Sequence, residues 1–202
     1  NQTDPPRFTM HGGTISDNTA GASDGGGGGV YVGEKCSFTM DGGAITGNKA
    51  TAGNGGGIYI HFNAGTVSIS NATITGNKAS ATGNTSYGHG GGIYSERGVT
   101  VENVTITGNN STFEGGGIYG KGAITLTDAT VTDNSQYDVY YDGRESNTPE
   151  LTISGSVKAG YYANEAWKLP ILVSGALRED SVIRVGCLLY TSPSPRDRSV
   201  SR

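Results

Sequence analysis

Three groups of residues in this sequence have types and spacings suited to chemistry, and glycine is the first. A triple glycine followed by an apolar residue and a tyrosine recurs at Gly55–Tyr59, Gly90–Tyr94 and Gly115–Tyr119. A glycine-rich loop binds phosphate when its N–H groups and a following helix meet the anion. Here a strand pattern follows the glycines, and no Lys-Ser or Lys-Thr pair does. We therefore favour a structural role, at a corner that needs close backbone approach and positive φ.

Carboxylates are the second group. Glu102 and Asp128 lie at equivalent bends of neighbouring repeats, one position apart. Glycoside-cleaving enzymes place two carboxyl groups roughly 5 to 10 Å apart, which makes this the best catalytic pair in the chain. The alternative, which we favour, is that both are solvated bend residues. A nearby stripe of mixed charge is also more typical of solubility than of catalysis, and it comprises His61, Glu96, Arg97 and Lys121.

Aromatic residues and one long insertion are the third group, and they suit binding. Recurrent tyrosines predict an outward stacked column of Tyr31, Tyr59, Tyr94, Tyr119 and Tyr140. Stacking alone stabilises a sheet face, but aromatic faces also bind sugars, so Tyr59, Tyr94 and Tyr119 are candidate glycan-binding residues. The longest insertion, KASATGNTSYGH, adds Ser86, Tyr87 and His89.

Internal repeats must position all these residues. Five segments align without gaps: FTMHGGTISDN (8–18), FTMDGGAITGN (38–48), VSISNATITGN (67–77), VTVENVTITGN (99–109) and ITLTDATVTDN (124–134). A degenerate sixth copy begins at 151–157, and 171–186 has the pattern of a last pair of strands.

Within each repeat, apolar residues alternate with Thr or Ser, as in strands. The alternation shifts phase at a bend, for example at Ser70-Asn71, so the aligned segment holds two short strands. The strand after the glycines is a third, with Ile58 and Ile60 inward and Tyr59 outward. This pattern predicts an all-β fold: a parallel β-helix of about six coils, right-handed by the crossover rule.

An asparagine ends every aligned segment. Asparagine favours turns, but recurrence in one register favours a side-chain ladder between stacked coils, formed by Asn18, Asn48, Asn77, Asn109 and Asn134. The spacing from each tyrosine to the next of these asparagines stays at 15 to 18 residues, whereas the spacing from asparagine to the next tyrosine varies from 6 to 17. The variable loops, Thr19–Gly26, Lys49–Asn54, Lys78–His89 and Asn110–Glu114, should therefore share one corner of the coil and carry any recognition.

Outward threonines form a further pattern that resembles ice-binding β-solenoids. The pairs are Thr73 and Thr75, Thr105 and Thr107, and Thr130 and Thr132, with Ala44 and Thr46 and Thr14 and Ser16 completing the rank. Threonine also suits any exposed strand because it is β-branched and polar. Two of the five coils break the array, so ice binding is a minor alternative.

Composition excludes several classes of function. The chain has 202 residues, 35 of them glycine, and a net charge of −4. Its basic residues are scattered rather than aligned in a stripe, so nucleic acid is not an expected partner. No apolar run reaches the length of about 20 residues that spans a bilayer. His11, His61 and His89 lack metal-ligand spacing, and we expect neither a metal nor a cofactor.

The two ends of the chain predict a fragment. Asn1 is neither an initiator Met nor part of a signal-like segment. Residues 187–197, CLLYTSPSPRD, resemble the translation of a transposase sequencing adapter, the alternative being a Ser/Pro-rich linker. We therefore expect one β-helix domain over 1–186 and a non-native, disordered tail over 187–202. With Cys187 in the tail, Cys36 has no native partner and the redox compartment stays open.

The pairing of GGGIY with I-x-x-N resembles the polymorphic outer-membrane-protein repeat, whose signature is GGxI with FxxN. It is also similar to β-helical repeats of secreted adhesin-type proteins with a pectin-lyase-like fold. The resemblance covers residues 7–157, with Ile or Val where the signature has Phe. It implies a non-catalytic bacterial module, cell-surface or secreted, with glycans or surface proteins as partners. A polysaccharide lyase or glycoside hydrolase of the same fold is the alternative.

Overall fold

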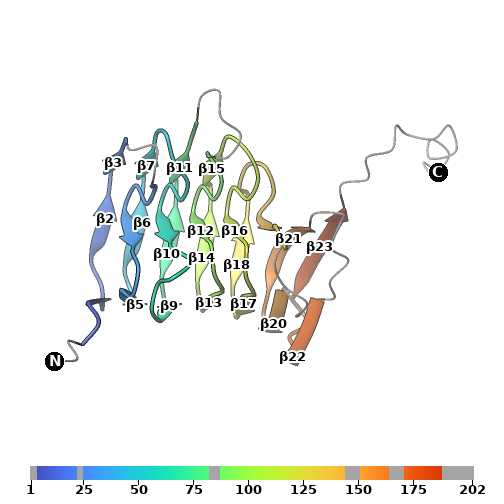
Figure 1. Ribbon diagram of the computed structural model, residues 1–202. Coiled ribbons are helices and arrows are strands. Elements are labelled where there is room, and N and C mark those ends of the chain that lie inside the picture. The colour runs from blue at the N-terminus through green and yellow to red at the C-terminus, as the bar shows by residue number, and fades with distance from the viewer. Residues whose placement is uncertain (1–3, 22–24, 82–86, 144–150, 164–170, 188–202) are drawn as a thin grey trace, which may run out of the picture.

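The fold is a stack of parallel coils. A computed structural model describes residues 4–21, 25–81, 87–143, 151–163 and 171–187. In these ranges the chain is all-β, contains no helix and winds through about six turns, which confirms the predicted parallel β-helix. The coils follow one another along a single axis, with β2 and β23 at opposite ends of the stack (Figure 1).

The first sheet forms one face of the stack. Each of its strands pairs in parallel with the equivalent strand of the next coil. In stacking order the strands are β1 (Arg7–Met10), β5 (Ser37–Asp41), β9 (Val67–Ser70), β13 (Val99–Glu102), β17 (Ile124–Thr127), β20 (Leu151–Gly155) and β22 (Ile171–Leu177).

The second sheet folds around two further faces. One limb contains β2 (Thr14–Ser16), β6 (Ala44–Thr46), β10 (Thr73–Thr75), β14 (Thr105–Thr107) and β18 (Thr130–Thr132). The other contains β4 (Val30–Val32), β8 (Ile58–Ile60), β12 (Ile93–Ser95), β16 (Ile118–Gly120) and β19 (Val139–Tyr141). The limbs meet because β21 (Lys158–Ala163) pairs with both β18 and β19, and β23 (Val182–Cys187) pairs with β21.

A third sheet, which the sequence pattern did not predict, adds a fourth strand to the coil. Its members are β3 (Thr19–Ala20), β7 (Lys49–Ala50), β11 (Lys78–Ala79) and β15 (Asn110–Ser111). Two residues are too few to show alternation, which is why the three-strand prediction was wrong. These strands begin directly after the ladder asparagines, so they carry the first residues of the variable loops.

Identical or similar apolar residues stack in register inside the coils. Ile45, Ile74, Ile106 and Val131 face one another across successive strands and are fully buried. Burying such a side chain contributes roughly 1.5 to 3 kcal/mol. The core therefore consists of columns, and each column is stabilised by contact with the coils above and below.

The predicted asparagine ladder is present as a continuous chain of hydrogen bonds. Each Nδ2 donates to the Oδ1 of the next asparagine at 2.9 to 3.0 Å, from Asn18 through Asn48, Asn77 and Asn109 to Asn134. Each Oδ1 from Asn48 onward also accepts the backbone N–H of the preceding asparagine. Three buried side-chain amides, those of Asn48, Asn77 and Asn109, thereby have both their oxygen and their nitrogen hydrogen-bonded within the protein.

The ladder has a direction and ends on a carboxylate. Asn134 Nδ2 donates to Asp138 Oδ1 at 3.1 Å, and Asn134 N donates to the same oxygen at 3.0 Å. An ionised carboxylate only accepts hydrogen bonds, so it closes a series in which every member donates forward. Asp138 Oδ2 accepts Gly160 N at 3.2 Å and joins this terminus to the following coil.

The triple glycines form a crowded corner and leave their N–H groups no capacity for an anion. Gly55 N, Gly56 N and Gly57 N donate to carbonyl oxygens of the next coil. Gly55 adopts a φ of 66°, and a Cβ at Gly56 would lie 2.4 Å from the carbonyl carbon of Lys78. Glycine is thus required here by backbone conformation and by close coil packing.

We predict that Asn77→Ala destabilises the fold by about 2 to 4 kcal/mol, because it leaves two buried donors of Asn48 without their acceptor. The urea midpoint of the circular dichroism signal measures this loss. Asn63→Ala, at an exposed turn, is the matched control and should leave the midpoint unchanged. Equal midpoints for the two variants would show that the ladder contributes nothing.

We also predict that Gly56→Ala destabilises the protein by about 3 kcal/mol, the cost of forcing extra volume into a packed interior. Gly12→Ala is the control because a Cβ at Gly12 meets nothing within 4 Å. Thermal melts of both variants measure the difference. A Gly56→Ala protein as stable as Gly12→Ala would contradict the packing role of the triple glycine.

Candidate functional site

The most distinctive cluster outside the core is the tyrosine column, which we define as Tyr31, Tyr59, Tyr94, Tyr119 and Tyr140. The rings stack along the axis with centroids 5.0, 5.1, 5.2 and 5.4 Å apart and planes inclined by 12° to 22°. The four rings from Tyr59 onward form a hydrophobic cluster of their own, separate from the core, as expected for side chains on the outer side of the coil.

The inner rings of this column, which include the candidate glycan-binding residues, are buried. Tyr59, Tyr94 and Tyr119 are only 8%, 3% and 5% exposed, whereas Tyr31 at the first coil is 50% exposed. Both faces of an inner ring contact neighbouring rings, and side chains from the adjoining corner cover the edges. Sequence alternation correctly placed the tyrosines outside the coil but contained no information about what covers them.

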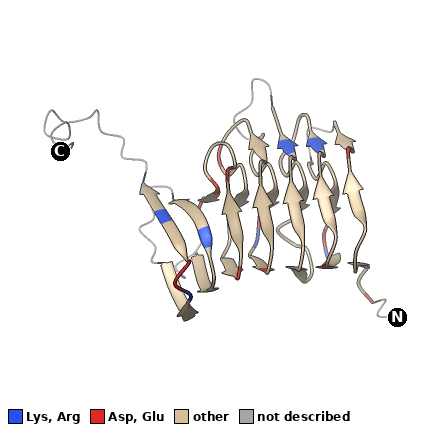
Figure 2. Cartoon of the chain, turned by 180° about the vertical axis from the view of Figure 1, so that it is seen from behind, with Lys and Arg blue, Asp and Glu red and all other residues tan. Residues whose placement is uncertain are grey.

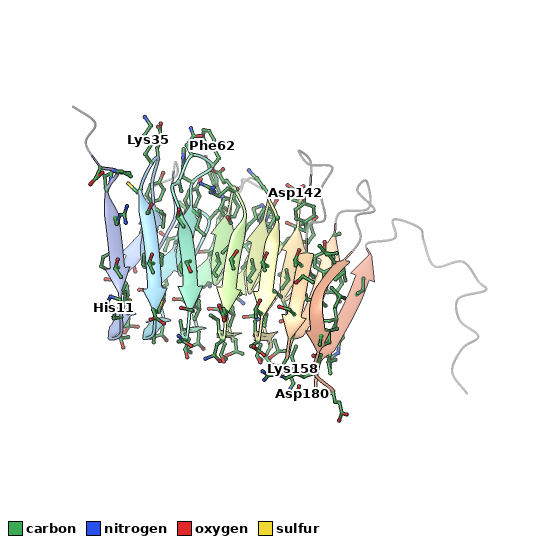
Figure 3. The ribbon with its side chains drawn as sticks, turned by 90° about the horizontal axis from the view of Figure 1, so that it is seen from below. His11, Lys35, Phe62, Asp142, Lys158 and Asp180 are labelled. Carbon is green, nitrogen blue, oxygen red and sulfur yellow. The ribbon has the colours of Figure 1, made fainter. Side chains whose placement is uncertain are left out.

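The cover on one side is a row of charged residues two positions after Tyr94, Tyr119 and Tyr140. Glu96, Lys121 and Asp142 occupy this place in successive coils, and their N–H groups donate to the preceding coil. Lys121 Nζ lies 3.5 Å from Glu96 Oε1 and 5.6 Å from the centroid of Tyr94. Figure 3 shows Asp142 at the same corner as Lys35 and Phe62, opposite His11 and Lys158.

Tyr119 and Asp142 form the tightest polar contact of this cluster. The Tyr119 hydroxyl donates to Asp142 Oδ2 at 2.6 Å, and both residues are 5% exposed. Burial and this hydrogen bond hold the pKa of Tyr119 far above its ordinary value, because ionisation would place a phenolate beside a carboxylate. The hydroxyl therefore remains a donor throughout the physiological pH range.

Glu96 and Lys121 affect the two preceding tyrosines in opposite ways. Burial, followed by the charge of Glu96, raises the pKa of Tyr59. Burial also raises the pKa of Tyr94, although Lys121 opposes that shift. Desolvation lowers the pKa of Lys121, but its contacts with Tyr94 and Glu96 outweigh this and raise the pKa above its ordinary value. These shifts keep the hydroxyls of Tyr59 and Tyr94 and the ammonium group of Lys121 protonated at neutral pH.

The long insertion folds back onto the tyrosine column at its last residue. His89, a candidate binding residue of this insertion, is 8% exposed. Its N–H donates to Asn54 Oδ1, its Nδ1 lies 2.9 Å from Glu114 Oε2, and its ring is 4.7 Å from that of Tyr119. His89 therefore anchors the loop. Tyr87 is half-buried, and Ser86 lies outside the described residues.

The candidate catalytic pair occupies the opposite corner. Glu102 is exposed and lies in register with Thr127, one residue before Asp128. Asp128 adopts a φ of 47°, and its Oδ1 accepts Ser156 N at 2.9 Å and lies 3.4 Å from Arg178 Nη1. These bonds direct Asp128 to the following coil, whereas Glu102 belongs to the preceding one.

The other charged residues of the predicted stripe have contacts that stabilise turns. Arg97 donates to the carbonyl oxygens of Ala64 and Gly65 and so fixes the turn that precedes β9. His61 Nδ1 accepts Asn63 N in the same turn. Charged residues of the described ranges occupy short, separate segments of the chain, in both turns and strands, as Figure 2 shows.

Asp142 and Glu114 contact the tyrosine column or its loop anchor, and the repeat pattern did not predict either of them. A signal for Asp142 was present, since it follows Tyr140 by two positions just as Glu96 follows Tyr94. No comparable signal existed for Glu114, because it lies in a variable loop and meets His89 only through tertiary folding. Position within a repeat predicts stacking partners, but it does not predict contacts between loops.

In the described ranges no three His, Cys, Asp or Glu side chains are grouped to hold a metal ion, and no helix there is long and apolar enough to cross a membrane. Comparison with protein-family models, curated proteins and solved structures finds no match to this chain.

We predict that the buried tyrosines couple stability to alkaline pH. Their pKa values are raised in the fold, so above about pH 10 the unfolded chain loses phenolic protons first and stability falls as pH rises. Phenolate absorbance and circular dichroism, followed together, should change in one step. Ionisation of all 11 tyrosines near pH 10 with an intact fold would contradict this coupling.

Proposed function

We propose that this chain is a non-catalytic β-helical module of a bacterial surface or secreted protein, which displays variable loops to glycans or surface proteins. The observation that carries the proposal is that recurrent and variable residues occupy different positions around the coil. The recurrent residues have structural partners: asparagines in the ladder, glycines in the crowded corner, and tyrosines in a buried stack. What differs between coils is concentrated in the loops that begin at β3, β7, β11 and β15.

The first positions of those loops support a binding role. Thr19, Lys49, Lys78 and Asn110 lie in register at the start of the loops, and all four are exposed. They form a polar base beneath segments of unequal length, while the ladder asparagines next to them hold the backbone in place. A rigid base with variable loops is a common arrangement for recognition.

The repeat signature supports the biological setting of the proposal. GGGIY with I-x-x-N resembles repeats of polymorphic outer-membrane proteins and adhesins, and an extracellular or cell-surface location follows from that resemblance. The contacts of Asp128 favour a structural over a catalytic role at that corner, because its carboxylate bonds to a backbone N–H and an arginine of the next coil.

We predict that the longest loop determines binding. The full chain, displayed on beads, is to be tested against a glycan array and a panel of matrix proteins. Replacing residues 80–87 with a Gly-Ser segment of equal length retains β11 and the His89 anchor. It should reduce binding to the preferred ligand at least tenfold. Exchanging the turn residues Glu34 and Lys35 for Ser and Gly is the matched control and should preserve binding.

Two results would overturn this proposal. Binding that is unchanged by the loop replacement would move recognition to another surface. Release of reducing or unsaturated sugar ends from a polysaccharide, lost in Asp128→Asn or Glu102→Gln, would establish the enzymatic alternative instead.

A further inference from the structure

The tyrosine column is a continuous series of stacked π systems along the axis of the coils, and neither sheet stability nor recognition by the loops requires such a path. Five rings follow one another at centroid distances of 5.0 to 5.4 Å. Tyr137 and then Tyr162 extend the series beyond Tyr140, at 5.9 and 4.0 Å. Electron transfer between aromatic rings weakens steeply with distance, so neighbours at this separation are well coupled.

The path has one accessible entrance among the five rings of the column. Tyr31 is 50% exposed, while the four inner rings are at most 8% exposed. A bulky oxidant in solution therefore contacts Tyr31 and not the rings behind it. The environments of those inner rings then determine which ring is left oxidised.

Tyr119 has the environment that best stabilises the oxidised state. Removing an electron from a tyrosine makes its phenolic proton strongly acidic, and here the proton is already hydrogen-bonded to Asp142 Oδ2 at 2.6 Å. Transfer of that proton converts a neutral phenol and a carboxylate into a neutral radical and a neutral carboxylic acid. Both groups are buried, and burial favours neutral forms over charged ones.

The other carboxylate beside the column is a poorer acceptor. Glu96 lies next to Tyr59 but is paired with Lys121 at 3.5 Å. Protonating Glu96 would leave the partly buried ammonium group without its counter-charge. The pairing of Glu96 with Lys121 thus makes Tyr119, which donates to Asp142, a less costly place for oxidation than Tyr59, which lies beside Glu96.

We propose that the tyrosine column conducts oxidising equivalents from exposed Tyr31 to buried Tyr119, with Asp142 as the proton acceptor. A high-potential one-electron oxidant, such as a ferryl haem or a metal polypyridyl complex, is reduced by one electron. The protein loses that electron, the proton stays on Asp142, and a one-electron reductant reverses the step. The column then serves the module as a sink for oxidants, independently of what its loops bind.

The free cysteine Cys36 allows this path to be tested from its entrance. Cys36 N donates to Gly33 O, and a Cβ at Gly33 would lie 3.3 Å from Tyr31 Cε1 and 4.0 Å from Cys36 Sγ. A ruthenium polypyridyl complex attached to Cys36, in the full chain carrying Cys187→Ser, generates the oxidant next to Tyr31. Flash-quench oxidation followed by freezing and high-field EPR identifies the radical.

The expected spectrum is that of a strongly hydrogen-bonded tyrosyl radical, which is lost in Tyr119→Phe. Asp142→Asn keeps an acceptor oxygen but cannot take the proton, so it should also abolish this signal. Tyr59→Phe and Tyr94→Phe keep a stacked ring that the complex cannot oxidise, and each should reduce the signal at least tenfold. Tyr161→Phe, in the main core and outside the column, should leave it unchanged.

Because either Tyr59→Phe or Tyr94→Phe could misfold, both are used to interrupt the path, and circular dichroism checks that each variant is folded. The proposal is overturned if folded Tyr59→Phe or Tyr94→Phe gives the wild-type amount of the Tyr119 radical. It is equally overturned if the wild-type radical has the spectrum of a solvent-exposed tyrosine, because the oxidising equivalent would then have remained on Tyr31.

Discussion

Stacking of parallel coils in register is the constraint on which the rest of this structure depends. Each side chain lies one strand spacing, about 4.8 Å, from the equivalent side chain of the next coil. A position must therefore accept a neighbour of its own kind. Isoleucine packs on isoleucine, as at Ile74 and Ile106, and an asparagine amide both donates to and accepts from the next, as at Asn77 and Asn109. Tyrosine rings satisfy the same condition by stacking.

That constraint separates the recurrent positions of the coil from the variable ones. Positions that repeat are tied to the coils on either side, so a change at one of them disturbs several contacts. After each ladder asparagine the constraint extends only through the two-residue strand, and the residues that follow can differ from coil to coil in number and type. Like-on-like stacking also has a consequence for the tyrosines, since a series of rings placed for packing is, by the same geometry, a path for electrons.

Periodicity predicted the fold because each element of the fold is itself periodic. The two strands before Asn77, the strand after Gly57 and the ladder could all be read from residues that recur. The fourth strand could not, because Lys78–Ala79 is too short to alternate. Burial of Tyr94 and the anchoring of His89 by Glu114 were also beyond reach, since both depend on which loop covers which corner. Contacts of this kind do not recur from coil to coil, so they leave no periodic pattern in the sequence.

Spin labels on one outer face test the stacked-coil account most directly. Thr14 and Thr130 lie in one register column, linked through Ala44, Thr73 and Thr105, and are therefore four strand spacings apart. With Cys36 and Cys187 replaced by serine, nitroxides at these two positions should give a narrow distance distribution centred at about 19 Å by pulsed EPR. A broad distribution, or one centred beyond about 30 Å, would contradict in-register stacking.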